Sequence, residues 1–422
     1  MANKKLKYIF IVGGVMSGVG KGVASASIGK ILQSRGFEVT AIKIDPYVNV
    51  DAGTMNPTEH GEVFVLDDGM ECDQDMGNYE RFLNRDLTKN NYMTTGSIYQ
   101  TVINRERRLA YKGKCVEVVP HIPLEVLNKI SNAARKNKAE IAITEIGGTV
   151  GEYQNILFLE AVRMLKLKNP PDVLLVLVSY LPFIGAQGEL KTKPTQYAAR
   201  TLNSAGLQPD IIIARTALPV DKKRKEKIAF NCGLKEEEII SAPDVDNIYK
   251  IPINFEKDNL SAVITKKLNI KPRKKDLKEW KKFIVKTESV KETVKIGIAG
   301  KYFTTGDFIL TDSYISVIEA VKHAAYFFKK KPVIEWLNVE EFSIEGKPAP
   351  NGEKQDLSAL EKFDGIIVPG GFGNRGVEEK IAVIGYCRKK QIPYLGICYG
   401  MQLAVVEFAR NAAQLKNAHT TE

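Results

Sequence analysis

The stretch Gly13–Gly22, "GGVMSGVGKG", follows the apolar run Tyr8–Val12 and opens a segment rich in Ala, Ser and Gly. A glycine-rich turn between a strand and a helix lets backbone N–H groups converge on phosphate oxygens, and Lys21 adds a positive charge. The usual loop reads G-x-x-x-x-G-K-[ST], and its last hydroxyl binds Mg²⁺. Here five residues, not four, separate the two framing glycines, and Gly22 stands where Ser or Thr is usual. The stretch predicts either a phosphate-binding loop or a tight turn, and it leaves open which residue would hold a metal ion.

Short β-branched apolar runs alternate with helical stretches along the N-terminal half of the chain. The runs are Tyr8–Val12, Val39–Ile44, Ile141–Ile146, Val173–Val178 and Ile211–Ala214. The helical stretches between them include Gly22–Arg35, Leu124–Lys136 and Gln154–Lys166. Strands that are apolar throughout and alternate with helices are typical of a parallel sheet covered on both faces. We therefore expect a doubly wound α/β domain.

A chain of 422 residues is too long for one ordinary core, and a second α/β series follows the first. Its elements are Val294–Ala299, a helical Asp312–Phe328, Val333–Leu337, Gly365–Val368 and Tyr394–Ile397. We assign residues 1–270 to a first domain, 271–293 to a linker and 294–422 to a second domain.

The linker Lys271–Glu292 carries nine basic and four acidic residues and contributes to a formal net charge of +11. A basic excess is compatible with nucleic acid or with acidic small substrates. Trp280 and Phe283 lie at helical spacing, so an amphipathic helix with a solvated face is expected rather than a nucleic-acid site.

Composition narrows the class of protein further. No apolar run approaches the length of a membrane span, and the N-terminal residues show no secretion signal. The five cysteines are odd in number and form no C-x-x-C pair, which indicates reduced thiols and no structural zinc. A cytoplasmic protein with no membrane partner is expected.

Two acidic positions answer the question that the loop raises. "MECDQDMGNYERF" contains Asp75, and "AITEIGGTVGE" places Glu145 near the end of a buried strand. The carboxyl ends of parallel strands surround the ligand crevice in such sheets. Mg²⁺ prefers oxygen ligands and usually takes one or two protein carboxylates. Asp75 and Glu145 are therefore the predicted metal ligands, although a solvated loop is the simpler interpretation of Asp75 taken alone.

The segment "GELKTKPTQYAAR", residues 188–200, concentrates two ammonium groups, two hydroxyls and an amide between Lys191 and Gln196. Such a set suits a triphosphate with an adjoining polar base, although a charged turn is an alternative interpretation.

The segment "GICYG", residues 396–400, places Cys398 between an apolar strand and a helix. This is a nucleophile elbow with Cys in place of Ser, and the helix N-terminus favours the thiolate. Upstream, "IIVPGGFGNRG" ends another strand at Gly370 and Gly371. Backbone N–H groups there and at Tyr399 are candidates for an oxyanion hole.

Taken together, these motifs resemble the CTP synthase family, which converts UTP to CTP with ammonia from glutamine. The resemblance runs from about Lys7 to Glu422 and is carried by "GGVMSGVGKG", "KIDPYVNVDAGTMNPTEHGEVFV", "TEIGGTVGE", "KTKPTQ", "DVDNIYKIP", "VPGGFGNRG" and "GICYGMQ". It implies a P-loop amidoligase domain of the dethiobiotin-synthetase-like kind with a parallel sheet, followed by a partial class I glutamine amidotransferase domain of flavodoxin-like fold.

The resemblance also implies roles for individual residues. For catalysis these are Lys21, Lys43 and Cys398. For ATP they are Gly18, Val19, Gly20, Lys21, Gly22, Val23, Asp75, Pro243, Asp244 and Val245. For UTP and CTP they are Ser17, Glu152, Tyr153, Gln154, Lys191, Thr192, Lys193, Pro194, Thr195, Gln196 and Lys227. For glutamine they are Gly371, Tyr399, Gly400, Met401, Gln402 and Glu422.

The reaction implied by the resemblance needs Mg²⁺ and ATP, which phosphorylates O4 of UTP before ammonia displaces the phosphate. The family further implies GTP as an activator, CTP as an inhibitor and a homotetramer. An amidoligase of the same fold with another substrate, and a subunit that assembles without turnover, are the alternatives. A nucleic-acid binder would leave Glu145 and Cys398 unexplained.

This chain departs from the family pattern in three places. Glu152-Tyr153-Gln154 replaces the common Asp-Ile-Glu, and Tyr399 stands where Leu is common. A cysteine glutaminase needs a His base, which the family supplies in a segment well downstream of Cys398. His419 is the only His after Cys398, and we interpret it as a surface residue. We therefore expect a partial glutaminase domain and a chain that uses ammonia rather than glutamine.

Overall fold

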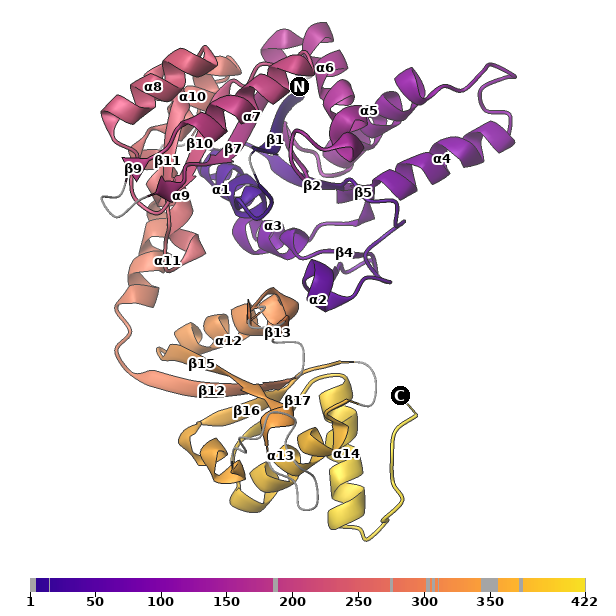
Figure 1. Cartoon of the computed structure of the whole chain (residues 1–422), viewed down its shortest axis with the longest axis vertical. Coiled ribbons are helices and arrows are strands. Elements are labelled where there is room, and N and C mark those ends of the chain that lie inside the picture. The colour runs from indigo at the N-terminus through magenta and orange to yellow at the C-terminus, as the bar shows by residue number, and fades with distance from the viewer. Residues whose placement is uncertain are drawn as a thin grey trace. The chain divides into compact units, whose positions relative to one another are not determined.

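The computed structural model describes residues 5–14, 16–184, 189–273, 276–300, 304–305, 308–309, 311–342, 356–371 and 375–421. The chain divides into two compact units (Figure 1). The first comprises Met1–Thr54 and Val63–Lys281, and the second comprises Met55–Glu62 and Lys282–Glu422.

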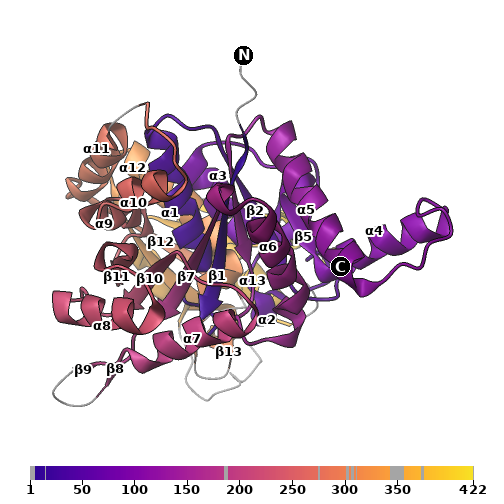
Figure 2. The same ribbon diagram turned by 90° about the horizontal axis from the view of Figure 1, so that it is seen from above.

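The first unit is built on a seven-stranded parallel sheet, which confirms the expected doubly wound architecture. Its strands in spatial order are β11 (Ile239–Pro243), β10 (Ile211–Thr216), β7 (Val173–Tyr180), β1 (Lys7–Gly14), β6 (Ile141–Ile146), β2 (Val39–Asp45) and β5 (Tyr92–Thr94). The labels β11, β10, β7 and β1 follow one another in this order in Figure 2. All five strands expected from the apolar runs are present.

Helices cover both faces of this sheet. One face carries α4 (Thr95–Arg107), α5 (Val118–Lys136), α6 (Ile156–Lys168), α7 (Lys193–Ser204) and α8 (Lys222–Cys232). The other carries α1 (Lys21–Ser34), α9 (Ile251–Lys257) and α10 (Leu260–Lys267), and α3 (Asp75–Leu83) packs against α1. Successive strand residues point to opposite faces, so Phe10 joins the first core and Ile11 the second.

Several short elements of the first unit lie outside the sheet. They include the antiparallel pairs β3 (Val63–Val65) with β4 (Glu71–Asp73) and β8 (Phe183–Ile184) with β9 (Glu189–Leu190), and the 3₁₀ turn η5 (Ile248–Lys250). The helix expected from Leu124 starts earlier, at Val118, although Val119 has a non-helical φ of −113°. The early part contains Pro120 and Pro123, and Pro is tolerated near the start of a helix.

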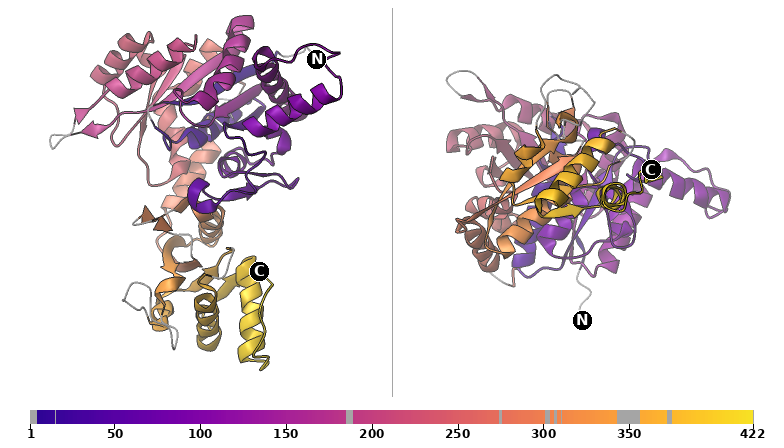
Figure 3. Two further views of the ribbon diagram at one scale, coloured as in Figure 1. Left: turned by 45° about the vertical axis from the view of Figure 1, so that its right-hand side comes forward. Right: turned by 90° about the horizontal axis from the view of Figure 1, so that it is seen from below.

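The second unit contains a four-stranded parallel sheet in the order β15 (Lys331–Asn338), β12 (Thr293–Gly300), β16 (Gly365–Val368) and β17 (Tyr394–Gly396). Helix α12 (Ile315–Phe327) packs on one core, and α13 (Val377–Lys390) and α14 (Tyr399–Asn411) pack on the other. The last two lie side by side (gold and yellow in Figure 3) and are joined by bidentate hydrogen bonds from Arg388 to Glu407. Short elements are α2 (Pro57–His60), β13 (Thr304–Thr305) and β14 (Phe308–Ile309).

Helix α11 (Lys278–Glu288) occupies the stretch for which an amphipathic linker helix was expected. The helix expected at Asp312–Phe328 begins with a 3₁₀ turn, and its α-helical part starts at Ile315. Among the described residues, no helix combines the length and the apolar character that crossing a membrane requires.

Candidate nucleotide and glutamine sites

The glycine-rich loop joins β1 to α1, as the sequence predicts. Gly18 and Gly20 have φ angles of 71° and 81°, a left-handed conformation that favours glycine. A Cβ atom at Gly13 would lie 2.9 Å from the Lys21 Nζ atom, so the lysine side chain folds back over the loop. Burial lowers the pKa of Lys21, although the nearby Glu145 carboxylate opposes this shift. The loop therefore places the buried Lys21 ammonium group next to glycine backbone that carries no side chain.

Lys43 lies at the centre of a carboxylate cluster, which we define as Asp45, Asp73, Asp75 and Glu145 and in which only Asp75 is half-buried rather than buried. Its Nζ atom is 2.5 Å from Asp75 Oδ2 and 3.1 Å from Glu145 Oε1. The nearest oxygens of Asp45 and Asp73 are each 3.7 Å away. Lys43 and Glu145 are cross-strand neighbours on β2 and β6, near the carboxyl ends of both strands. The register of the sheet thus assembles the cluster.

The pKa values of several side chains in the cluster differ strongly from their ordinary values. Burial lowers the pKa of Lys43, but the surrounding carboxylates raise it well above its ordinary value. Burial raises the pKa of Asp75 to about 7 and that of Asp45 to about 6, against the lowering effect of Lys43. Desolvation is the main cause, and the neighbouring carboxylates of Asp73 and Glu145 raise both pKa values further by repulsion.

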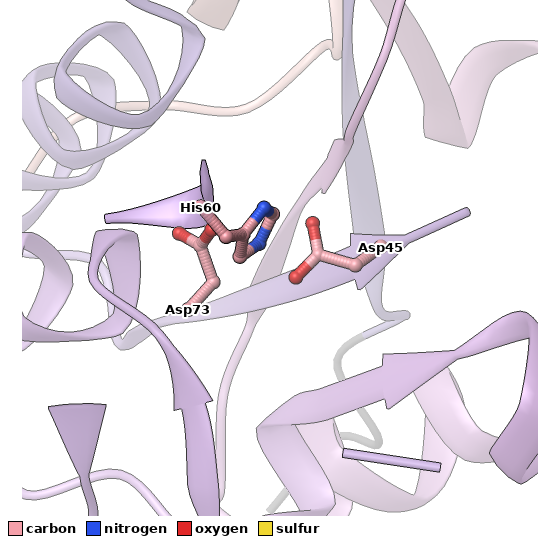
Figure 4. A group of neighbouring side chains, drawn as sticks. All are labelled: Asp45, His60 and Asp73. Carbon is pink, nitrogen blue, oxygen red and sulfur yellow. The ribbon is translucent and has the colours of Figure 1, made fainter. Parts of the chain in front are cut away.

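Tyrosine hydroxyls hold two of these carboxylates in place. Tyr79 on α3 donates a hydrogen bond to Glu145 Oε2. Tyr92 on β5 donates to Asp45 Oδ2 at 2.9 Å, and Tyr47 donates to the same oxygen at 3.2 Å. Figure 4 shows Asp45 and Asp73 with their carboxylates. His60, which Figure 4 also labels, belongs to the segment Met55–Glu62 of the second unit, so the site is defined by the carboxylates of the first unit alone.

The cluster fits a divalent cation. The donors are all carboxylate oxygens, which are the protein ligands that Mg²⁺ prefers. A Cβ atom at Gly22 would lie 1.8 Å from Asp75 Oδ1, so the carboxylate occupies the space that a side chain after Lys21 would need. The Asp75 carboxylate thus lies where the side chain of a Ser or Thr after Lys21 would be.

A cavity of about 200 Å³ lies next to the loop, between α1, the end of β11 and α9. The three residues predicted to face the ATP base, Pro243, Asp244 and Val245, all line it, as do Gly20 and Val23. Sequence reasoning missed seven further lining residues, which are Ala24, Arg215, Ala242, Ile248, Ile251, Asn254 and Phe255. Arg215 forms an ion pair with Asp244 at 2.8 Å, a contact that no local motif announces.

The segment predicted to bind UTP forms the start of α7. Thr192, Thr195 and Gln196 are buried, and Lys191 and Lys193 are exposed. Thr195 Oγ1 lies 2.9 Å from Ser179 Oγ on β7, and Gln196 Nε2 donates to Thr192 Oγ1 at 3.1 Å. Pro194 lies in the first turn of the helix. Half of the segment thus builds the helix start, and its lysines face solvent.

The other residues expected at the pyrimidine nucleotide lie on the surface of the first unit. Ser17 is exposed in the loop, and Lys227 is exposed on α8. Glu152 accepts a hydrogen bond from the Thr149 backbone N–H at 2.8 Å and another from Gln154 Nε2 at 2.6 Å. Tyr153 is 90% exposed. Hydrogen bonds of Glu152 with Thr149 and Gln154 therefore stabilise the segment Glu152-Tyr153-Gln154, which departs from the family pattern.

Cys398 has the strained backbone of a nucleophile elbow, with φ 53° and ψ −114°, between β17 and α14. A Cβ at Gly396 would lie 2.6 Å from the Gly400 backbone, and one at Gly400 would lie 2.0 Å from the Val368 carbonyl oxygen. A Cβ atom added at Gly370 would lie 3.4 Å from Cys398 Cβ, so Gly370 is a neighbour of the Cys398 side chain. The sharp turn leaves Cys398 exposed.

The residues expected to bind glutamine surround this elbow in part. Gly371 follows β16, Met401 is 53% exposed, and the side chain of Tyr399 is buried. Gln402 Oε1 accepts a hydrogen bond from Thr420 Oγ1 at 2.7 Å. His419 is exposed, as predicted, and its Nδ1 contacts the Thr420 carbonyl. Glu422 lies outside the described residues.

Together, a phosphate-binding loop with a carboxylate cluster and a cysteine elbow define a glutamine-dependent amidoligase. Comparisons with known proteins agree. Residues 7–270 match the model of the CTP synthase N-terminus, and residues 309–421 match that of the class I glutamine amidotransferases.

The chain is similar over 99% of its length to curated CTP synthases. It is 48% identical to that of Pyrococcus furiosus, of which it covers 74%, and 48% identical to that of Methanocaldococcus jannaschii, of which it covers 76%. Among solved structures, it is similar to the Trypanosoma brucei CTPS glutaminase domain with bound acivicin, at 38% identity over 31% of this chain and 46% of that chain, with a TM-score of 0.26. The chain belongs to the CTP synthase family, glutamine-hydrolysing ligases of pyrimidine biosynthesis.

Proposed function

We propose that the first unit aminates UTP to CTP in an ATP-dependent reaction, with ammonia as the immediate nitrogen donor. The observation that carries this proposal is the position of the carboxylate cluster beside the loop, with Asp75 in the space left free by Gly22. Phosphate loop, cation ligands and base cavity all lie in one unit, as a single nucleotide site requires.

Asp75 and Glu145 would hold Mg²⁺, which when bound neutralises charge on the phosphates of ATP. Lys21 and Lys43 place two further positive charges at the same site, where they stabilise negative charge on the phosphoryl group as it moves to O4 of UTP. The backbone N–H groups of Gly18 to Val23 bind the phosphates of ATP. Pro243 to Val245, which line the cavity, face its base. These groups bind and orient the nucleotide without forming a covalent bond to it.

UTP is assigned to the start of α7. Lys191, Lys193 and the more distant Lys227 supply exposed ammonium groups for a triphosphate, and the helix N-terminus adds its partial positive charge. Product CTP carries the same triphosphate, so we expect it to compete with UTP for this segment. Activation by GTP and assembly into a homotetramer follow from the family resemblance alone.

In the second unit, Cys398 is assigned as the nucleophile that attacks the carboxamide carbon of glutamine. The Cys398 thiolate forms a thioester with the γ-glutamyl group, the leaving nitrogen takes up a proton and departs as ammonia, and water then hydrolyses the thioester to glutamate. Gly371 and Tyr399 to Gln402 surround the elbow and are assigned to glutamine binding.

The test is CTP formation from UTP, ATP, Mg²⁺ and ammonium chloride, with the nucleotides separated by chromatography. Lys21→Ala should lower the rate by about 10²–10³-fold, because a charge that stabilises the phosphoryl group is lost. Lys266→Ala is the matched control, since Lys266 is exposed on α10 and far from the loop in the chain. A Lys21→Ala rate close to that of Lys266→Ala would show that the loop does not bind the phosphates.

A further inference from the structure

Trp280, near the start of α11, is bound to the first unit by specific contacts. Its indole Nε1–H donates a hydrogen bond to the Tyr249 carbonyl at 2.8 Å. Its ring lies 5.8 Å from the ring of Tyr249 and 5.4 Å from that of Phe82. Phe82 and Tyr249 stack on each other at 5.1 Å and are both buried. The three rings therefore form one aromatic cluster, which we define as Phe82, Tyr249 and Trp280.

Helix α1 completes this contact. The Lys30 ammonium lies 4.9 Å from the centre of the Trp280 ring, within the range of a cation–π interaction. Close by in sequence, Gln33 Nε2 donates to the Leu83 carbonyl at the end of α3, at 2.9 Å. Gly29 lets Leu83 approach, because a Cβ there would be 3.0 Å from Leu83 Cδ2. Trp280 thus lies where the ends of α1 and α3 meet.

Each element that Trp280 contacts also carries part of the nucleotide site. Helix α1 begins at Lys21, and α3 begins at Asp75. Tyr249 is the middle residue of the turn η5. The residue before it, Ile248, and the residue two positions after it, Ile251, both line the cavity. Along α1, Lys30 is about 13 Å from Lys21, so Trp280 touches the far end of the helix rather than the phosphates themselves.

Apolar packing already attaches the start of the linker helix to the first unit. An amphipathic helix with one solvated face turns Trp280 toward the core of the first unit. Leu277, one turn earlier in the chain, is already buried in that core. The directed Nε1–H bond to a backbone carbonyl fixes the position of η5 as well as that of the helix. A packed aromatic contact of this kind couples the position of one element to that of the next.

We propose that Trp280 is a positioning residue for the base cavity: through Tyr249 it holds η5, and thereby Ile248, in the position that binds the base of ATP. The linker helix α11 then sets the affinity for ATP from outside the cavity. This inference rests on the proposed function, since it takes the cavity to be the site of the ATP base.

The test compares Trp280→Phe, which keeps an aromatic ring but removes the hydrogen-bond donor, with Val285→Ala on an exposed position of the same helix. With ammonia as nitrogen donor, Trp280→Phe should raise the KM for ATP about fivefold, the effect of one lost hydrogen bond. The kcat and the KM for UTP should stay within a factor of two of the wild-type values. Val285→Ala should change none of these constants.

A second measurement does not depend on turnover. The chain has two tryptophans, so Trp336→Phe leaves Trp280 as the sole tryptophan. Titration of this variant with ATP should change the intensity or the emission maximum of Trp280 fluorescence, with the same saturation curve as ATP binding measured by calorimetry. Lys30→Met, which removes the cation above the ring, should weaken ATP binding in the same direction.

The possible outcomes separate the two proposals. If Trp280→Phe and Lys30→Met lower the melting temperature but leave ATP affinity unchanged, Trp280 is only a structural anchor and the inference is wrong. A Trp280 signal that does not respond to saturating ATP would overturn it as well. If instead Val245→Trp, which fills the cavity, leaves wild-type ATP affinity intact, the base does not bind there and the proposed function of the cavity fails first.

Discussion

The carboxylate cluster of the first unit and the cysteine elbow of the second reach their chemistry in opposite ways. The elbow lies within five consecutive residues, Gly396 to Gly400. The strained backbone conformation of Cys398 determines where its thiol lies. The cluster combines Lys43, Asp75 and Glu145, which come from two strands and a helix. Its chemical properties depend on the ion pairs between these side chains. A local site depends on glycines at close approaches, whereas a dispersed site depends on sheet register and compensation of charge.

The largest expected effect separates the two sites completely. Cys398→Ala should abolish covalent labelling by a glutamine-like electrophile such as 6-diazo-5-oxo-norleucine, because the sulfur that forms the bond is gone. The same variant should form CTP from ammonia at the wild-type rate. Mass spectrometry of the labelled chain and the ammonia assay give the two readings.

Cys115→Ala is the matched control for that experiment, since Cys115 is the other exposed free cysteine among the described residues. It should keep the label. A loss of ammonia-dependent activity in Cys398→Ala would mean that the elbow supports the first unit and that the two sites are not independent.

The next effect concerns the glycine after Lys21. Gly22→Ser restores the usual loop pattern, yet it should lower the ammonia-dependent rate by about 10²-fold or more, because its side chain collides with Asp75. Binding of Mn²⁺, followed by electron paramagnetic resonance, should weaken in parallel. Labelling of Cys398 should not change.

Gly18→Ser provides the contrast in the same loop, because an ideal Cβ at Gly18 meets no atom within 4 Å. Its effect should be limited to the cost of a left-handed φ, about 1 kcal/mol in stability. Equal Mn²⁺ affinities for the Gly22→Ser variant and the wild type would show that Asp75 is not a ligand.

The smallest effect is one of stability in the second unit. Burial by itself raises the pKa of Glu407, but hydrogen bonds from Arg388 and Asn411 bring it below its ordinary value. A folded-state pKa below the unfolded value stabilises the fold above the unfolded pKa, and this contribution is lost as pH falls through the folded pKa. Glu407→Gln should therefore cost about 1–3 kcal/mol at pH 7.

Urea denaturation of the wild type and the variant at pH 7 and at pH 3 tests this expectation, with the second unit followed by Trp336 fluorescence in a Trp280→Phe background. The difference between them should shrink at the lower pH. A constant difference would mean that packing, rather than the charge of Glu407, makes the contribution.

Sequence reasoning reached the parts of the site that are local. The loop glycines, the elbow around Cys398 and the strand end at Glu145 each have a signature within about ten residues, and the strand and helix pattern was sufficient for the doubly wound sheet. Asp75 was a weaker prediction, because an acidic loop residue is usually solvated, and its place in the cluster depends on α3 packing against α1. Roles for Lys43 and for the UTP segment came from the family resemblance.

The amino-acid sequence by itself determined the fold class and the family, and it predicted the phosphate loop, the nucleophile and two cation ligands, because these depend on periodicity and on short motifs. Only the tertiary structure decided that Lys43 lies among four carboxylates, that Tyr79 holds Glu145, and that Asp75 fills the space above Gly22. It also decided that Trp280 donates a hydrogen bond to the Tyr249 carbonyl, a partner that helical spacing alone did not predict. The physical reason is that charge compensation and packing act between atoms that are close in space, and strand register and helix packing bring such atoms together from distant parts of the chain.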